Sequence, residues 1–108
     1  VRRFLKLTAR LLAQAEVTGE GLRQLSGMSR LVKLDLANTK LGDADLAMLE
    51  PLESLEFLGL LGTKVTDASS LHLAHFTGLT FLDLYDTRFT ATGITQLSKS
   101  LPNCRINY

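Results

Sequence analysis

Leucines recur along the chain with a fixed period of 24 residues. Starting at Leu31, Leu55 and Leu79, three segments align without a gap: LVKLDLANTKLGDADLAMLEPLES, LEFLGLLGTKVTDASSLHLAHFTG and LTFLDLYDTRFTATGITQLSKSLP. A period in this range is typical of a short strand-and-helix unit that buries its apolar side only against neighbouring units. We therefore expect a repeat protein whose units stack one against the next.

Each unit follows the pattern L-x-x-L-x-L-x-x-T-x-[LVF], with its threonine at Thr39, Thr63 or Thr87. Because side chains alternate along a strand, Leu34 and Leu36 should point to one face while Asp35 points to the other. The pattern predicts parallel strands centred near residues 33–36, 57–60, 81–84 and 105–107. In the first three of these strands we expect the leucine face to be buried, and in the fourth Ile106 takes the equivalent position.

Helices are expected after the strands. The segments Thr66-Asp67 and Leu41-Gly42-Asp43 give a helix-start signal, because a short oxygen-bearing side chain, such as that of Thr66 or Asp43, can accept from the first free helical N–H groups. Apolar residues at helical spacing follow, which predicts helices near residues 20–27, 43–50, 67–75 and 91–100. Pro102 should end the last one. These helices would form a second layer behind the sheet.

These motifs resemble those of the leucine-rich repeat family, in particular its short bacterial-type repeats, which carry the sequence seen here as TKVTD at residues 63–67. The resemblance implies an α/β fold: a right-handed solenoid with a parallel sheet on its concave face and helices on its convex face. It also implies a protein-binding module. The family often has Asn where this chain has Thr39, Thr63 and Thr87, but a Thr hydroxyl can also bond loop backbone, so stacking should be retained.

We expect one domain over residues 1–108, with repeats near 7–30, 31–54, 55–78 and 79–102 and a terminal strand at 103–108. Residues 1–6 match the end of an earlier repeat, which predicts that the chain is part of a longer one. Two alternatives remain open for the N-terminal segment: a degenerate repeat, or a capping helix from Arg2 to Ala15.

Composition narrows the functional classes. The chain is 45% hydrophobic and 21% charged, which suits a globular domain with a continuous core. Its net charge of +1 gives no reason to expect binding to nucleic acid or to an acidic membrane. No membrane span or signal peptide is evident in the sequence, which slightly favours the cytoplasm without assigning a compartment. One cysteine cannot form an intramolecular disulfide framework.

Candidate catalytic and metal-binding residues are few. His72 and His75 lie three apart on a predicted helix, a spacing that could hold a metal, but no carboxylate pair is evident beside them, and a partly solvated surface pair is the simpler interpretation. Cys104 is expected to fill space, because both histidines should lie on a helix of a different unit. We expect no enzyme activity, no metal and no cofactor.

A row of basic residues follows the ladder threonines, at Lys40, Lys64 and Arg88. Strand spacing would place them roughly 5 Å apart. Such a row could hold an anion or could be an exposed, solvated turn, and we expect the second.

The open face of the sheet is the main candidate binding surface. Alternation places Phe57 beside Phe81 and Leu61 beside Tyr85 on this face, where polar residues are the usual filler. Large apolar groups on a wet face often mark interaction sites. Between the two apolar pairs lies Gly59, flanked by Asp35 and Asp83, and this arrangement suggests a dent for a partner's Lys or Arg.

Two functions are compatible with this sequence. The first is a module that binds a protein partner through Phe57, Leu61, Phe81, Tyr85, Asp35 and Asp83. The second is a structural spacer or capping segment of a larger repeat or multidomain protein, in which another part of that protein would cover Phe57 and Phe81. The apolar open face favours the first, because a spacer needs only polar residues there.

Overall fold

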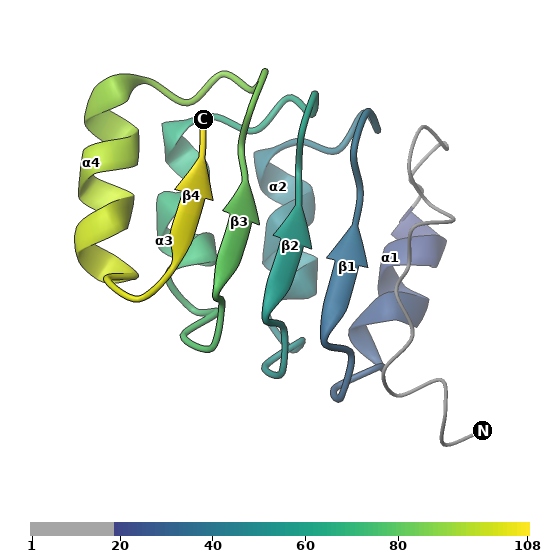
Figure 1. Cartoon of the computed structure of the whole chain (residues 1–108). Coiled ribbons are helices and arrows are strands. Elements are labelled where there is room, and N and C mark those ends of the chain that lie inside the picture. The colour runs from purple at the N-terminus through teal and green to yellow at the C-terminus, as the bar shows by residue number, and fades with distance from the viewer. Residues whose placement is uncertain (1–18) are drawn as a thin grey trace.

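Four short strands form one parallel sheet in this computed structural model, which describes residues 19–108. The strands run in the order β1-β2-β3-β4 (Figure 1). Their bounds are β1 Lys33–Asp35, β2 Phe57–Gly59, β3 Phe81–Asp83 and β4 Arg105–Asn107. The register pairs Leu34 with Leu58, Leu58 with Leu82, and Leu82 with Ile106. Residues that share a phase in the sequence pattern therefore lie side by side.

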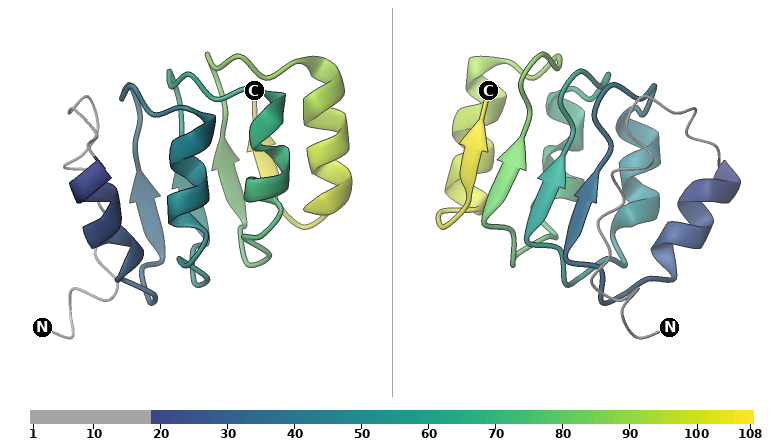
Figure 2. Two further views of the ribbon diagram at one scale, coloured as in Figure 1. Left: turned by 180° about the vertical axis from the view of Figure 1, so that it is seen from behind. Right: turned by 45° about the vertical axis from the view of Figure 1, so that its right-hand side comes forward.

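The helices pack together behind one face of this sheet, so that the molecule has two layers (Figure 2). Their bounds are α1 Gly19–Ser26, α2 Asp43–Leu46, η3 Ala47–Leu49, η4 Asp67–Ser69, α3 Ser70–Leu73 and α4 Ala91–Ser100, where η marks a 3-10 helix. The α/β fold with a parallel sheet is confirmed. The predictions for Arg2 to Ala15, and for residues 1–6, lie outside the described residues.

Two of the expected helices are each made of two short pieces. The segment predicted at 43–50 is α2 followed by η3, and the segment predicted at 67–75 is η4 followed by α3. Their 3-10 turns are held by bonds such as Glu50 N–H to the Ala47 carbonyl and Ser69 N–H to the Thr66 carbonyl. Bonds to the third residue back tighten a helix and are common at its ends. Pro51 follows η3 and cannot donate a helical hydrogen bond.

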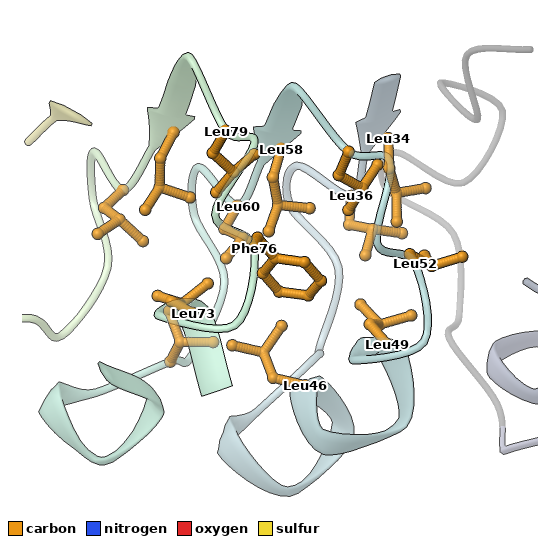
Figure 3. Packing of buried hydrophobic residues seen from close by; sticks show 14 of the residues in the cluster. Leu34, Leu36, Leu46, Leu49, Leu52, Leu58, Leu60, Leu73, Phe76 and Leu79 are labelled. Carbon is orange, nitrogen blue, oxygen red and sulfur yellow. The ribbon is translucent and has the colours of Figure 1, made fainter. Parts of the chain in front are cut away.

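The core lies between the two layers and consists almost wholly of leucine (Figure 3). Leu34, Leu58 and Leu82 are fully buried, as are Leu36 and Leu60. The ring of Phe76 lies between leucines of the sheet side and leucines of the helix side and is 1% exposed. The leucine face predicted from alternation is therefore the core.

The turn after each strand repeats the same backbone conformation. In each turn one residue adopts the left-handed backbone conformation, with φ of 60° at Asn38, 72° at Gly62 and 59° at Asp86. These are the residue types that enter this region at least cost. The next residue is a threonine whose hydroxyl donates to the carbonyl three residues earlier: Thr39 to Leu36 at 2.8 Å, Thr63 to Leu60 at 2.7 Å and Thr87 to Leu84 at 2.7 Å. The expected bonding of Thr to the loop backbone is confirmed.

Aspartates at the helix starts tie neighbouring units together. Asp43 accepts the N–H of Thr66 at 2.8 Å, the Thr66 hydroxyl at 2.7 Å and the Ser69 hydroxyl. Asp67 accepts the N–H and hydroxyl of Thr90 in the same way, at 2.8 and 2.5 Å. The two threonines also accept from N–H groups of their own helices. One aspartate–threonine pair thus caps a helix and joins it to the preceding unit.

These hydrogen bonds set the pKa of Asp43. Burial alone would raise this pKa, but the hydrogen bonds from Ser69 and Thr66, together with the electrostatic influence of nearby His72, outweigh burial and hold the pKa below its usual value of 3.8. The folded state therefore favours the ionised carboxylate more than the unfolded state does.

The first prediction concerns the leucine core. Leu60→Ala should lower the free energy of unfolding by about 2–5 kcal/mol, because a fully buried leucine loses its contacts and leaves a cavity. Leu71→Ala is the matched control, since Leu71 is 79% exposed and its truncation should change stability by less than about 0.5 kcal/mol. Urea unfolding of both variants measures the difference. Equal effects would show that Leu60 is not a core residue.

The second prediction concerns Gly93, which lies buried inside α4. In an ordinary helix, Gly→Ala stabilises by about 1 kcal/mol. Here a Cβ at position 93 would collide with the Asp67 carboxylate, so Gly93→Ala should break the bonds of Asp67 to Thr90 and destabilise by about 1–2 kcal/mol. In an Asp67→Ala background the same substitution should stabilise. Thermal unfolding of the original chain, the two single variants and the double variant tests the change of sign, and a stabilising Gly93→Ala in the original chain would contradict it.

The third prediction concerns acid stability. Because the pKa of Asp43 is lowered by folding, its contribution is fully present above its unfolded pKa and is lost as the pH falls through its folded value, below 3.8. The gap in melting temperature between the original chain and Asp43→Asn should therefore be widest near neutral pH and should close below pH 3.8. Glu53→Gln, at an exposed position, should show no such gap. A gap that stays constant with pH would contradict the prediction.

Candidate functional site: the open face of the sheet

The face of the sheet opposite the helices, here called the open face, contains all six residues predicted to bind a partner. Register and backbone bonds between strands arrange its side chains in three rows. The first row is Lys33, Phe57, Phe81 and Arg105; the second is Asp35, Gly59, Asp83 and Asn107; the third is Ala37, Leu61 and Tyr85. The open face therefore has a polar row between two rows that carry apolar groups.

An aromatic pair forms the centre of the first row. The rings of Phe57 and Phe81 are stacked, with centroids 5.3 Å apart and planes inclined by 16°. Both side chains are half-buried. In-register pairing of β2 and β3 produces this contact, because it places the two residues directly side by side. The stacked pair therefore presents an apolar surface that is partly exposed to solvent.

The third row adds a second apolar pair. Leu61 is half-buried, and Tyr85 is 55% exposed. The backbone bond from Gly62 N–H to the Tyr85 carbonyl, 3.0 Å, keeps this part of the two strands adjacent. Tyrosine in such a position offers both a ring face and a hydroxyl to a partner. Apolar contact is thus available at both margins of the polar row.

The dent expected at Gly59 is occupied by the side chain of Asp35. A Cβ on Gly59 would lie 2.8 Å from the Asp35 Oδ1 atom, so the carboxylate lies over the glycine. Asp35 is only 8% exposed and accepts the N–H of Ala37 at 3.0 Å. The predicted cavity for a basic side chain between two carboxylates is therefore not formed. The absent side chain of Gly59 makes room for Asp35 instead.

Asp83 occupies the equivalent place on β3 and is likewise engaged. Its Oδ1 atom accepts the N–H of Tyr85 at 3.1 Å and the side-chain amide of Asn107 at 3.0 Å. Asp83 is half-buried. Each of these two carboxylates thus accepts the N–H two residues further on, and Asp83 also joins β3 to β4, roles that alternation alone did not predict.

Two cations flank the aromatic pair. Lys33 pairs with Phe57 on one side, and Arg105 pairs with Phe81 on the other. Both are exposed, and within residues 19–108 neither forms an ion pair. Sequence analysis assigned the charged contacts with a partner to Asp35 and Asp83, beside the apolar residues of this face, and assigned no role to Lys33 and Arg105. The sequence signal that could have identified them is their position in the repeat: Lys33 and Arg105 lie 24 residues before Phe57 and 24 residues after Phe81.

A histidine–carboxylate cluster lies on the helix side. His72 Nδ1 is 2.6 Å from Glu50 Oε2, and His75 Nε2 is 3.7 Å from the same oxygen. Sequence analysis missed Glu50, which comes from the end of the preceding helical segment and has no counterpart in the repeat pattern. In the described part of the chain, no group of three His, Cys, Asp or Glu residues is placed to hold a metal ion.

The remaining candidates offer little chemistry. Burial raises the pKa of the Cys104 thiol, which favours the unreactive protonated form. Lys40, Lys64 and Arg88 are exposed in successive turns, and no ion pair joins them to any other described residue. No helix among residues 19–108 is long and apolar enough to cross a membrane.

Comparison with known proteins identifies the fold. A solved leucine-rich repeat protein of Leptospira interrogans superposes on 80% of this chain with a TM-score of 0.64 and 21% sequence identity. The match spans 21% of the length of that protein. No protein-family model and no curated protein matches the chain. The likeness shows a shared fold, in agreement with the parallel sheet and its helices.

Proposed function

We propose that this chain is a segment of a right-handed leucine-rich repeat solenoid with repeats of 24 residues, whose concave surface is the open face. Residue pairs that bond across neighbouring strands, such as Asp83 and Asn107, are separated by 24 residues, which supports this period. Solenoids of this kind present an extended concave surface for binding. The proposed function is recognition of a protein partner through that surface, without catalysis.

The observation that carries this proposal is the stacked pair of Phe57 and Phe81 in contact with solvent. A protein gains free energy by burying such rings, and nothing in the strand alternation requires aromatic residues at these positions. Aromatic side chains also dominate the energetics of protein interfaces. With the exposed Tyr85 they form a group of anchors on one face.

The alternative is a spacer or capping role in a larger repeat protein. It is favoured by the comparison, in which this chain corresponds to 21% of the length of the matching protein. In that case another segment would cover Phe57 and Phe81. The two functions differ in whether the open face is accessible to a separate molecule.

The fourth prediction tests the proposed function. Phe81→Ala should weaken binding of a protein partner by roughly tenfold or more, about 1.4 kcal/mol, because a desolvated ring is lost from the interface. Isothermal titration calorimetry with a partner first obtained by crosslinking from source cells provides the measurement. Far-ultraviolet circular dichroism should show an unchanged fold.

Two controls accompany it. Leu71→Ala removes an exposed apolar side chain from the helix side and should leave affinity unchanged. The triple variant Lys40→Ala, Lys64→Ala and Arg88→Ala should also bind nearly as well as the original chain. Binding that survives loss of both Phe57 and Phe81 but is abolished in the triple variant would move the site to the turns.

A further inference from the structure

The charges on the open face differ in how far they are engaged within the fold. Asp35 is buried and accepts a backbone N–H, and Asp83 accepts two hydrogen bonds from Tyr85 and Asn107. A partner's cation would have to compete with these internal donors. Lys33 and Arg105 are exposed and form no ion pair with the described residues. The positive charges are therefore the ones that are free to meet a partner.

The spacing of the first row defines the shape of a matching ligand. Neighbouring strands lie about 4.8 Å apart, so the backbones at Lys33 and Arg105, three strands apart, are separated by about 14 Å. An extended peptide advances about 3.3 Å per residue, so residues i and i+4 are about 13 Å apart. Side chains i, i+2 and i+4 point to the same side. A segment lying across the strands would therefore place residue i+2 above the pair of Phe57 and Phe81.

From this match we propose that the open face binds an extended acidic segment of a protein partner, with Asp or Glu at positions i and i+4 and an aromatic or large aliphatic residue at i+2. This inference rests on the proposed function and specifies its partner. Lys33 would pair with one carboxylate, and Arg105 could bind the other in bidentate fashion. The central side chain would pack on the two rings.

Affinity and selectivity should come from different parts of this contact. Exposed ion pairs contribute little net stability because both ions are well solvated, whereas the aromatic surface gains from losing contact with water. Phe57 and Phe81 should therefore supply most of the affinity. Lys33 and Arg105 should select acidic over basic segments, because like charges brought together at an interface oppose binding.

The fifth prediction tests the acidic preference with three fluorescein-labelled nine-residue peptides that have blocked ends. One has Glu at its third and seventh positions, Phe at the fifth and Ser or Thr elsewhere; the second has Lys in place of both Glu; the third has Ala in place of Phe. In fluorescence polarisation at about 0.15 M salt, the first should bind at least about tenfold more tightly than either of the others. Higher salt should narrow the gap between the first two, because it screens exposed charges.

Charge-reversal variants locate the preference. The double variant Lys33→Glu and Arg105→Glu should prefer the Lys peptide over the Glu peptide. The double variant Lys40→Glu and Lys64→Glu changes the net charge by the same amount but lies in the turns, and it should keep the preference for Glu. If the first double variant is unfolded by circular dichroism, Lys33→Gln with Arg105→Gln should instead abolish the preference.

Each contrary result has a separate meaning. Tighter binding of the Lys peptide by the original chain would overturn the acidic partner. Equal binding of the Glu and Lys peptides, weakened by Phe81→Ala, would also overturn it but would leave the proposed binding face intact. Failure of all three peptides to bind would overturn the extended-segment proposal. The proposed function would still be decided separately, by whether Phe81→Ala weakens binding of a whole protein partner.

Discussion

Burial of one leucine row against the next in exact parallel register is the constraint on which the rest of this structure depends. A single strand of three residues with one apolar face has no stability of its own, and it gains a core only from the strand beside it. Leu34, Leu58 and Leu82 achieve this by lying directly side by side. Because side chains alternate, a slip of one residue would expose this whole row. The core therefore fixes the register of the open face as well.

The polar contacts between units act within that register. Each left-handed turn is closed by a threonine hydroxyl that donates to the carbonyl of the leucine just after the strand. Asp43 and Asp67 each accept two hydrogen bonds from the threonine of the next unit. These hydrogen bonds satisfy backbone N–H and C=O groups at helix and strand ends that would otherwise have no partner within the protein. Burial of the leucines stabilises the stack without fixing an orientation, whereas the hydrogen bonds of the threonines and aspartates require a specific geometry between neighbouring units. The sequence Thr-Asp at residues 66–67 serves both neighbours at once.

What could be predicted from the sequence follows from this division. The strands, the buried leucines and the rows of the open face depend only on the 24-residue period and on the alternation of side chains along a strand. Both can be read directly from the sequence. Burial of Asp35 over Gly59 and the contact of Glu50 with His72 depend on where a side chain reaches into the neighbouring unit. The repeat pattern does not indicate which residue of the neighbouring unit such a side chain will contact. Likewise, the division of the helical segments into 3-10 and α pieces depends on local bonds, such as that of Ser69 to the Thr66 carbonyl.

The same distinction explains the character of the open face. Its rows follow from the core register, but its chemistry is set by the side chains that internal bonds leave unengaged. Asp35 accepts the N–H of Ala37, and Asp83 accepts the N–H of Tyr85 and the side-chain amide of Asn107, so both carboxylates are engaged within the fold. Lys33, Phe57, Phe81 and Arg105 have no such role, since the described fold gives the cations no counter-ion and leaves the rings half-exposed. These four adjacent side chains are therefore the part of the open face that hydrogen bonds and ion pairs among the described residues leave unengaged.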